Sequence, residues 1–156
     1  MTYTIQILPS FDIVGICVRT KNAPGAAEID IPALWGRFFS ENISSLIANR
    51  ASDDIYSVYT DYETDQMGAY TTLIGHKVIG TLELTDILTK TTISAGTYYE
   101  FDSSGKQPDR LLEIWSHIWA GHYPRKYTSD FDLYEEVKSD SANTKKVKTF
   151  ILTTDE

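Results

Sequence analysis

Cysteine, positive charge and long apolar runs are all scarce in this sequence of 156 residues. The one cysteine, Cys17, has no partner for an internal disulfide, and it lies in the apolar stretch IVGICVRT (13–20). We consider two interpretations of it, a small buried side chain or a thiol made reactive by Arg19. No segment approaches the roughly 20 apolar residues that cross a bilayer, and the N-terminal MTYTIQILPS lacks the features of a signal peptide. We therefore expect a cytoplasmic protein.

The charge balance is acidic, with 22 Asp and Glu against 14 Lys and Arg and a formal net charge of −8. Nucleic-acid binding draws much of its affinity from cations that neutralise phosphates, so we expect no direct nucleic-acid contact. The cationic cluster KKVK (145–148) lies beside an expected C-terminal strand, where lysines protect a sheet edge. An acidic surface instead favours cationic partners.

Signatures of common catalytic and metal sites are missing from the sequence. The histidines, His76, His117 and His122, form no HExxH pattern, and the last two do not share a helical face. The chain also has no GxSxG motif, no phosphate-binding glycine loop and no dinucleotide fingerprint. We expect no metal, no cofactor and no catalytic residue that spacing alone identifies.

Hydrophobic periodicity predicts a strand, a helix and two strands, and then the same order again. In the first half the predicted strands are 3–8, 11–20, 55–63 and 70–80, with a turn at 67–68. Between them, apolar residues of 31–50 recur at steps of three and four, as in a helix, with Asp30 as its N-cap. The second half has a strand over 91–102, a helix over 109–120, and strands over 130–137 and 146–154 joined by a polar turn.

The two strands after each helix are joined by a short turn, which forces antiparallel pairing. We therefore predict an α+β fold in one domain, 1–156. It consists of two similar halves, about 3–80 and 91–155, around a pseudo-twofold axis.

The aromatic content indicates a binding site, since ten Tyr and three Trp outnumber six Phe. Tyr and Trp combine a flat apolar ring with a polar group and favour the walls of binding sites. In DDIYSVYTDYETDQMGAY (53–70), strand alternation places Tyr56 and Tyr62 on one face and Tyr59 and Asp61 on the other. A ring beside a carboxylate suits an organic cation. The alternative is that Tyr59 and Asp61 face water.

The second helix leaves two interpretations open. Glu113 and His117 are four residues apart, opposite the apolar face that carries Trp115 and Trp119. Glu113 is either half of a solvated pair or a carboxylate at the rim of a cavity.

Three stretches resemble the gyrase-inhibitor-like, AraC-type bacterial effector-binding domains: 58–75 (VYTDYETDQMGAYTTLIG), 111–119 (LLEIWSHIW) and 127–136 (YTSDFDLYEE). FDIVGICVRTKN (11–22) with LWGRFF (34–39) is most similar to stand-alone, integron-cassette-associated members. The resemblance covers nearly the whole chain. It implies that the sheet curls into a partly closed barrel with two helices. It also implies a cleft between the halves that receives bulky aromatic ligands, many of them cationic. The matching ligand-binding positions are Trp35, Tyr59, Tyr62, Tyr70, Glu113, Trp115 and Trp119, and strand alternation adds Asp61.

The chain departs from the family in its last strand. Many members carry an acidic cation partner there, whereas VKTFI (147–151) places Lys148 at that position. The ligand is then cationic only if Glu113, Asp61 or Glu63 substitutes, and otherwise neutral or anionic.

We therefore predict a stand-alone protein that binds small hydrophobic molecules, like the sensing domain of a transcription regulator. We expect no helix-turn-helix DNA reader, for which 156 residues leave no room. One alternative is a small hydrolase in which Glu113 and Tyr59 or Tyr70 form a general acid–base pair. The other is an acidic protein inhibitor of a DNA-handling enzyme.

Overall fold

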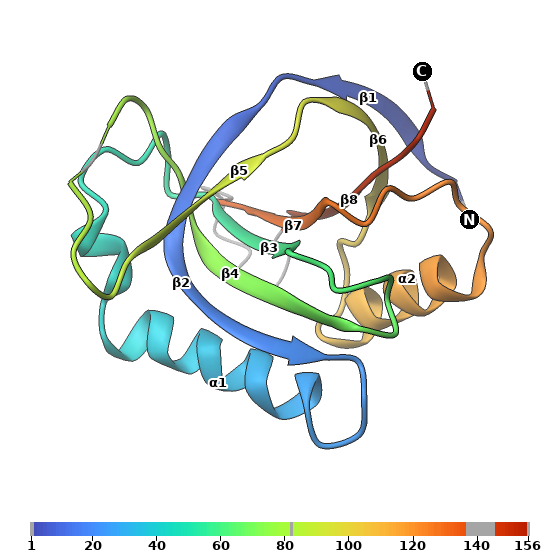
Figure 1. Cartoon of the computed structure of the whole chain (residues 1–156), viewed down its shortest axis with the longest axis horizontal. Coiled ribbons are helices and arrows are strands. Elements are labelled where there is room, and N and C mark those ends of the chain that lie inside the picture. Colours follow the sequence, from blue (N-terminus) through green and yellow to red (C-terminus); the bar gives the residue numbers. More distant parts are fainter. Residues whose placement is uncertain (1, 82, 137–145, 156) are drawn as a thin grey trace.

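The computed structural model describes residues 2–81, 83–136 and 146–155. These residues form one eight-stranded antiparallel sheet with two α-helices beside it (Figure 1). The elements, in chain order, are β1 (Thr4–Leu8), β2 (Phe11–Lys21), α1 (Ala27–Ser40), a 3₁₀ turn (Ile43–Leu46), β3 (Ile55–Thr60), β4 (Ala69–Lys77), β5 (Thr89–Ile93), β6 (Gly96–Asp102), α2 (Asp109–Ala120), β7 (Ser129–Glu135) and β8 (Lys146–Leu152).

The strand order β1-β6-β8-β7-β3-β4-β2-β5 shows the duplication directly. The three strands β6-β8-β7 of the second half mirror β3-β4-β2 of the first, and β7 pairs with β3 at the centre. The first strand of each half is exchanged, because β1 pairs with β6 and β5 pairs with β2. The predicted α+β fold with a curled sheet is confirmed.

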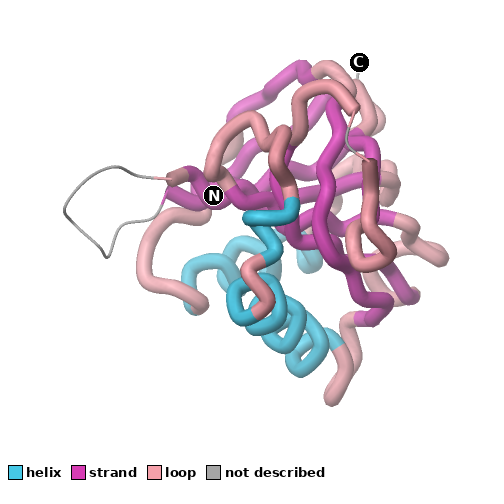
Figure 2. The backbone as a smooth tube through the Cα atoms, turned by 90° about the vertical axis from the view of Figure 1, so that its left-hand side faces the viewer, coloured by secondary structure: helices cyan, strands magenta, loops and turns pink. Residues whose placement is uncertain are grey.

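The sheet buries side chains on both faces. Its inner face holds a core that includes Tyr56, Val58, Tyr98 and Phe131, and Cys17 packs half-buried against this core. The other face is covered by α1, which buries Leu34 and Phe38 among strand residues such as Ile74, and by α2, which buries Ile114, Trp115 and Ile118. Figure 2 shows both helices on the same side of the strands.

Neither α-helix in the described part of the chain has the length and apolar character needed to cross a bilayer. The polar turn expected between the last two strands falls largely in 137–145, outside the described residues.

Two predicted boundaries in the first half were wrong. The first helix begins at Ala27, so Asp30 is no N-cap but lies inside the helix, where its Oδ2 accepts a hydrogen bond from the Thr20 hydroxyl at 3.0 Å. The helix ends at Ser40 and not near residue 50. Asn42 adopts the left-handed region (φ 50°), which stops α-helical hydrogen bonding, and the apolar periodicity continues as a 3₁₀ turn.

The predicted strand 91–102 is in fact two strands, because β5 and β6 pair at opposite edges of the sheet and the chain turns between them. The strand predicted over 55–63 ends earlier, at Thr60, since Asp61 takes a φ of 51°. This left-handed residue breaks the alternation of side chains. The turn expected at 67–68 is confirmed, with Gly68 N–H donating to Asp65 O at 3.2 Å.

Candidate ligand-binding cleft

A cavity of about 920 Å³ lies between α1 and α2, on the face of the sheet that the helices cover; we call it the cleft. The loop before α1 and the loop between β3 and β4 also contribute to it, through Asn22 and Gln66. Aromatic rings make up much of its lining: Trp35, Tyr59, Tyr62, Tyr70, Trp115, Trp119 and Tyr134.

The rings hold one another mostly in edge-to-face contacts. On the α1 side, Trp35 meets Tyr134 with the two centroids 5.0 Å apart and the planes at 74°. On the α2 side, Trp115 meets Tyr59 at 5.3 Å and 80°, and Tyr59 meets Tyr70 at 6.1 Å and 75°. Such contacts stabilise aromatic pairs and fix the orientation of the lining. The cleft is therefore a preformed cavity whose aromatic lining is held in place by its own contacts.

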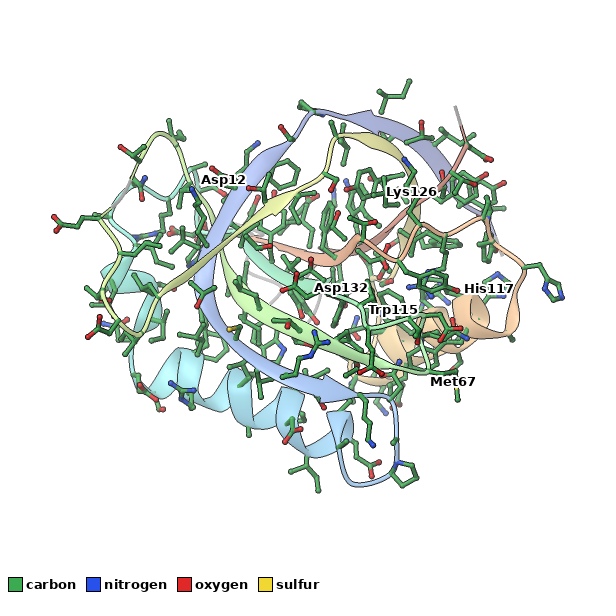
Figure 3. All side chains as sticks on the ribbon, in the orientation of Figure 1. Asp12, Met67, Trp115, His117, Lys126 and Asp132 are labelled. Atoms are coloured by element: carbon green, nitrogen blue, oxygen red, sulfur yellow. The ribbon has the colours of Figure 1, made fainter. Side chains whose placement is uncertain are left out.

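A fully buried carboxylate, Asp132 on β7, lies beneath the rings of the cleft. The Tyr59 hydroxyl donates to its Oδ2 at 2.6 Å, and the Thr149 hydroxyl donates to its Oδ1 at 2.6 Å. The indole N–H of Trp115 points at both oxygens, at 3.1 and 3.2 Å, and Figure 3 shows Trp115 of α2 next to Asp132. Burial outweighs these hydrogen bonds and raises the pKa of Asp132 to about 6.

A second buried carboxylate, Asp130, lies two residues earlier and therefore on the same face of β7. Its Oδ2 accepts from Arg125 Nη2 at 2.8 Å and from the Tyr62 hydroxyl at 2.6 Å, and its Oδ1 accepts from Leu152 N–H at 2.9 Å. The Arg125 side chain is itself only 2% exposed. It reaches Gln66 Oε1 with Nη1 at 3.0 Å.

Both buried carboxylates hydrogen-bond to tyrosines that line the cleft. Burial and the nearby charge of Asp132 raise the pKa of Tyr59 well above its usual value, and burial and Asp130 do the same for Tyr62. Both phenols therefore stay protonated and donate to the carboxylates.

Six of the eight predicted site residues line the cleft: Trp35, Tyr59, Tyr62, Tyr70, Trp115 and Trp119. Their role in binding stays a prediction. Tyr62 lines the cleft with Tyr59, contrary to the predicted faces, because the left-handed Asp61 reverses the alternation, while Tyr56 packs in the inner core.

The two predicted acids are placed elsewhere. Asp61 is exposed, just beyond the end of β3. Glu113 is on the outer face of α2 with its side chain 60% exposed, where it pairs with Arg110 at 2.8 Å. His117 does not pair with Glu113 and instead contacts the Tyr123 hydroxyl at 2.7 Å. The acid–base pair of the hydrolase alternative, Glu113 with Tyr59 or Tyr70, is therefore not assembled.

Sequence reasoning missed Asp130, Asp132, Arg125 and Tyr134. A usable signal exists in SDFDLYE (β7), where two acids and a tyrosine alternate with apolar residues. Since charged residues are rarely buried without partners, acids on a strand at the centre of a sheet would have indicated a buried polar cluster. Locating Arg125 needs the tertiary structure.

Lys148 does not bring a positive charge into the cleft. In the register of β7 and β8 it pairs with Leu133, while Thr149 pairs with Asp132, so Lys148 points to the opposite face of the sheet. Its Nζ lies 3.0 Å from Glu135 and 3.8 Å from Glu100. Lys148, which stands where many family members have an acid, therefore adds no charge to the cleft. The charge beneath the rings of the cleft comes from Asp132.

No three His, Cys, Asp or Glu side chains in the described ranges converge in a way that would hold a metal ion. The buried acids of the cleft contact hydroxyl, indole, guanidinium and backbone N–H donors. Their arrangement suits recognition of charge.

Comparison with known proteins gives concordant results. A family model described as an integron-associated effector binding protein matches residues 4–151. The Bacillus subtilis protein YobU, named as a transcriptional regulator protein, is 31% identical over 131 residues, which cover 78% of this chain and 79% of YobU.

Two solved structures have a similar fold. An integron cassette protein from the mobile metagenome of Vibrio cholerae is 29% identical, with a TM-score of 0.71 over 96% of this chain and 94% of that one. The protein SAV2435, solved bound to tetraphenylphosphonium, is 18% identical, with a TM-score of 0.78 over 97% of this chain and 93% of that one.

Proposed function

Because this chain belongs to the family of integron-associated effector-binding proteins, we propose that its cleft captures hydrophobic aromatic molecules and favours those with a positive charge. Each half contributes one wall, so the two halves act as a single binding domain. The observation that carries the proposal is a ring-lined cleft with the buried carboxylate of Asp132 directly beneath two of its rings.

The size and lining of the cleft support capture of an apolar guest. Small-molecule sites usually measure roughly 300 to 1,000 Å³, and this one has about 920 Å³. Burial of apolar surface contributes about 25 cal/mol for each Å² removed from water. Because the rings are already held by their neighbours, a guest loses little free energy to ordering them.

The charge beneath the rings supports a preference for cations. Aromatic faces attract cations through their quadrupole. Tyr59 and Trp115 line the cleft and both donate a hydrogen bond to Asp132, which lies beneath their rings. The ionised carboxylate therefore adds its negative potential to that of the ring faces. The described residues that hydrogen-bond to Asp132 are all uncharged. A guest cation therefore supplies the opposite charge that this buried carboxylate lacks.

The complex of SAV2435 with tetraphenylphosphonium supports the choice of probe. Tetraphenylphosphonium is an aromatic monocation, and we expect it to bind this chain in an isothermal calorimetric titration. Trp35→Ala is expected to weaken binding about tenfold, since it removes a ring from the α1 side of the cleft.

Ile29→Ala is the matched control, because Ile29 is on the same helix but 60% exposed and outside the cleft lining. We expect it to bind like the wild type. Absence of binding into the high micromolar range, or equal losses for Trp35→Ala and Ile29→Ala, would contradict the proposal.

In the transcription regulators that this chain resembles, the effector-binding domain captures a ligand in order to sense it. We propose the same sensing role for this chain. The hydrolase alternative loses its acid–base pair, since Glu113 lies outside the cleft. The inhibitor alternative stays a prediction that a search for a salt-sensitive protein partner tests.

A further inference from the structure

The two carboxylates beneath the cleft have different electrostatic surroundings, although both are fully buried on one face of β7. Asp130 forms an ion pair with Arg125 at 2.8 Å, and both side chains are buried. Within the described part of the chain, Asp132 has no charged hydrogen-bond partner and accepts from Tyr59, Trp115 and Thr149. Among the described residues, two buried acids thus lie beneath the cleft, and one of them, Asp132, has no cationic partner.

We propose that Arg125 neutralises Asp130, so that Asp132 alone sets the charge of the cleft and the cleft selects guests with one positive charge over neutral and doubly charged ones. This inference rests on the proposed function and names the class of ligand more narrowly. It makes Arg125 and Asp132 the residues that determine charge specificity.

The position of Arg125 explains why a second positive charge is disfavoured. Arg125 is itself part of the cleft lining, and its guanidinium lies over the rings of Trp115, at 5.7 Å, and Tyr127, at 4.4 Å. A dication would bring its second charge into a cleft that already holds this guanidinium, and like charges in a low-dielectric site repel.

Glu28, unlike Asp130 and Asp132, lines the cavity itself, and it does not change this count. Its side chain is at the exposed N-terminal turn of α1, where Oε1 accepts from Gly25 N–H at 2.7 Å. Charges in contact with water are screened, so Glu28 contributes little to a guest held inside. A dication with a short spacer keeps both charges away from it.

A proton competes with the guest cation for Asp132. The ionisable groups around it are Asp130 and Arg125, Tyr59 on β3, and Tyr134 on the same strand. Burial raises the pKa of Asp132 to about 6, and the neighbouring phenols stay protonated there. A monocation should therefore displace a proton from Asp132 near pH 6.

The test uses three guests built on one scaffold: triphenylphosphine oxide (neutral), methyltriphenylphosphonium (one charge) and (2-trimethylammonioethyl)triphenylphosphonium (two charges). Calorimetry at pH 8 gives their affinities for the wild type, Asp132→Asn, Arg125→Met and Asp130→Asn. For the wild type we expect the monocation to bind about tenfold more tightly than either of the others.

Each variant should change the charge count in its own direction. In Asp132→Asn, the advantage of the monocation over the neutral guest disappears. In Arg125→Met, Asp130 loses its cationic partner, so the cleft has two uncompensated negative charges. The affinity of the dication relative to the monocation then rises about tenfold. In Asp130→Asn, Arg125 is left unopposed and the monocation binds about tenfold more weakly. Near-ultraviolet circular dichroism establishes that each variant is folded.

A second measurement avoids substitutions at the ion pair. Titration of the wild type with methyltriphenylphosphonium at pH 6, in two buffers of different ionisation enthalpy, should show release of about half a proton, and none in Asp132→Asn.

A dication that binds the wild type as tightly as the monocation, or the same proton release with and without Asp132, would overturn the charge count. If none of the three guests binds the wild type, the proposed function itself fails. The two failures are thus distinguished.

Discussion

The two halves of this protein share one plan but contribute unequally to the cleft. Each supplies a helix with a tryptophan, Trp35 on α1 and Trp115 on α2. At the centre of the sheet, Ser57 and Tyr59 of β3 stand opposite Asp132 and Asp130 of β7. Both halves thus provide rings, and in the described part of the chain the buried carboxylates come from the second half.

This difference shows how a duplicated fold acquires a polarised site. A carboxylate on each of the facing strands would place two like charges together in a buried place, which is costly. Here uncharged hydroxyl groups from β3 face the acids of β7, and the Tyr59 hydroxyl bonds Asp132. The first half therefore donates one tyrosine hydrogen bond to each of the two carboxylates that the second half introduces.

The largest expected effect compares the two tryptophans. Trp115 is 8% exposed and bonded to Asp132, whereas Trp35 is only half-buried. We expect Trp115→Ala to lower the free energy of unfolding by about 3–5 kcal/mol, because it opens a cavity and removes a donor. Trp35→Ala should cost about 1–2 kcal/mol. Urea unfolding followed by circular dichroism measures the loss of stability in each variant. Equal losses would show that the two tryptophans do not differ in their contribution to stability.

The next effect is a pH dependence of stability that comes from the second half. Burial raises the pKa of Asp132 from 3.8 to about 6, so the native state holds a proton that the unfolded chain releases earlier. The stability that the protonated Asp132 contributes is therefore complete below pH 4 and is lost as the pH rises through about 6. The loss amounts to about 3 kcal/mol.

Urea unfolding at pH 4, 6 and 8 measures this dependence, and Asp132→Asn serves as the reference. The difference in stability between the wild type and Asp132→Asn should change with pH in the stated direction. A constant difference would show that Asp132 has an ordinary pKa.

A smaller effect tests the contribution of the first half to that carboxylate. Tyr59→Phe keeps the ring in the cleft and removes the hydroxyl that donates to Asp132 at 2.6 Å. A hydrogen bond to a charged group is worth roughly 1.5–3 kcal/mol, so we expect the variant to raise the pKa of Asp132 further. Titration of the carboxyl carbon by nuclear magnetic resonance gives the shift. An unchanged pKa would show that β3 does not satisfy the charge of β7.

The smallest expected effect is at Glu113. Its side chain is 60% exposed and its partner Arg110 is at the surface, so the ion pair contributes little. Glu113→Gln should change stability by less than about 0.5 kcal/mol and leave ligand affinity unaltered. Calorimetry and urea unfolding measure both. A loss of ligand binding in Glu113→Gln would show that Glu113 contributes to the cleft, and the hydrolase hypothesis would again have its acid.

Periodicity predicted most of the architecture because it is a local property. Steps of two marked the strands, steps of three and four marked the helices, and the resemblance added the curling of the sheet. Two of the errors occurred where a single backbone conformation overrode the pattern. Left-handed Asn42 ended α1, and left-handed Asp61 placed Tyr62 in the lining of the cleft together with Tyr59.

The rings of the cleft were easier to predict than its charge. Trp35 and Trp115 stand out by residue type, whereas one carboxylate among 22 Asp and Glu does not. Asp132 is distinguished by complete burial and by donors from β3, α2 and β8. These contacts join residues far apart in the chain, so only the assembled sheet brings them together.

A crystal structure of the protein grown with tetraphenylphosphonium would show directly whether the cleft binds an aromatic cation. We predict that the cation occupies the space between Trp35 and Trp115, with its charged centre on the side of Asp132. A cation bound elsewhere, or a cleft closed by its own side chains with Trp35 and Trp115 turned away, would contradict the account.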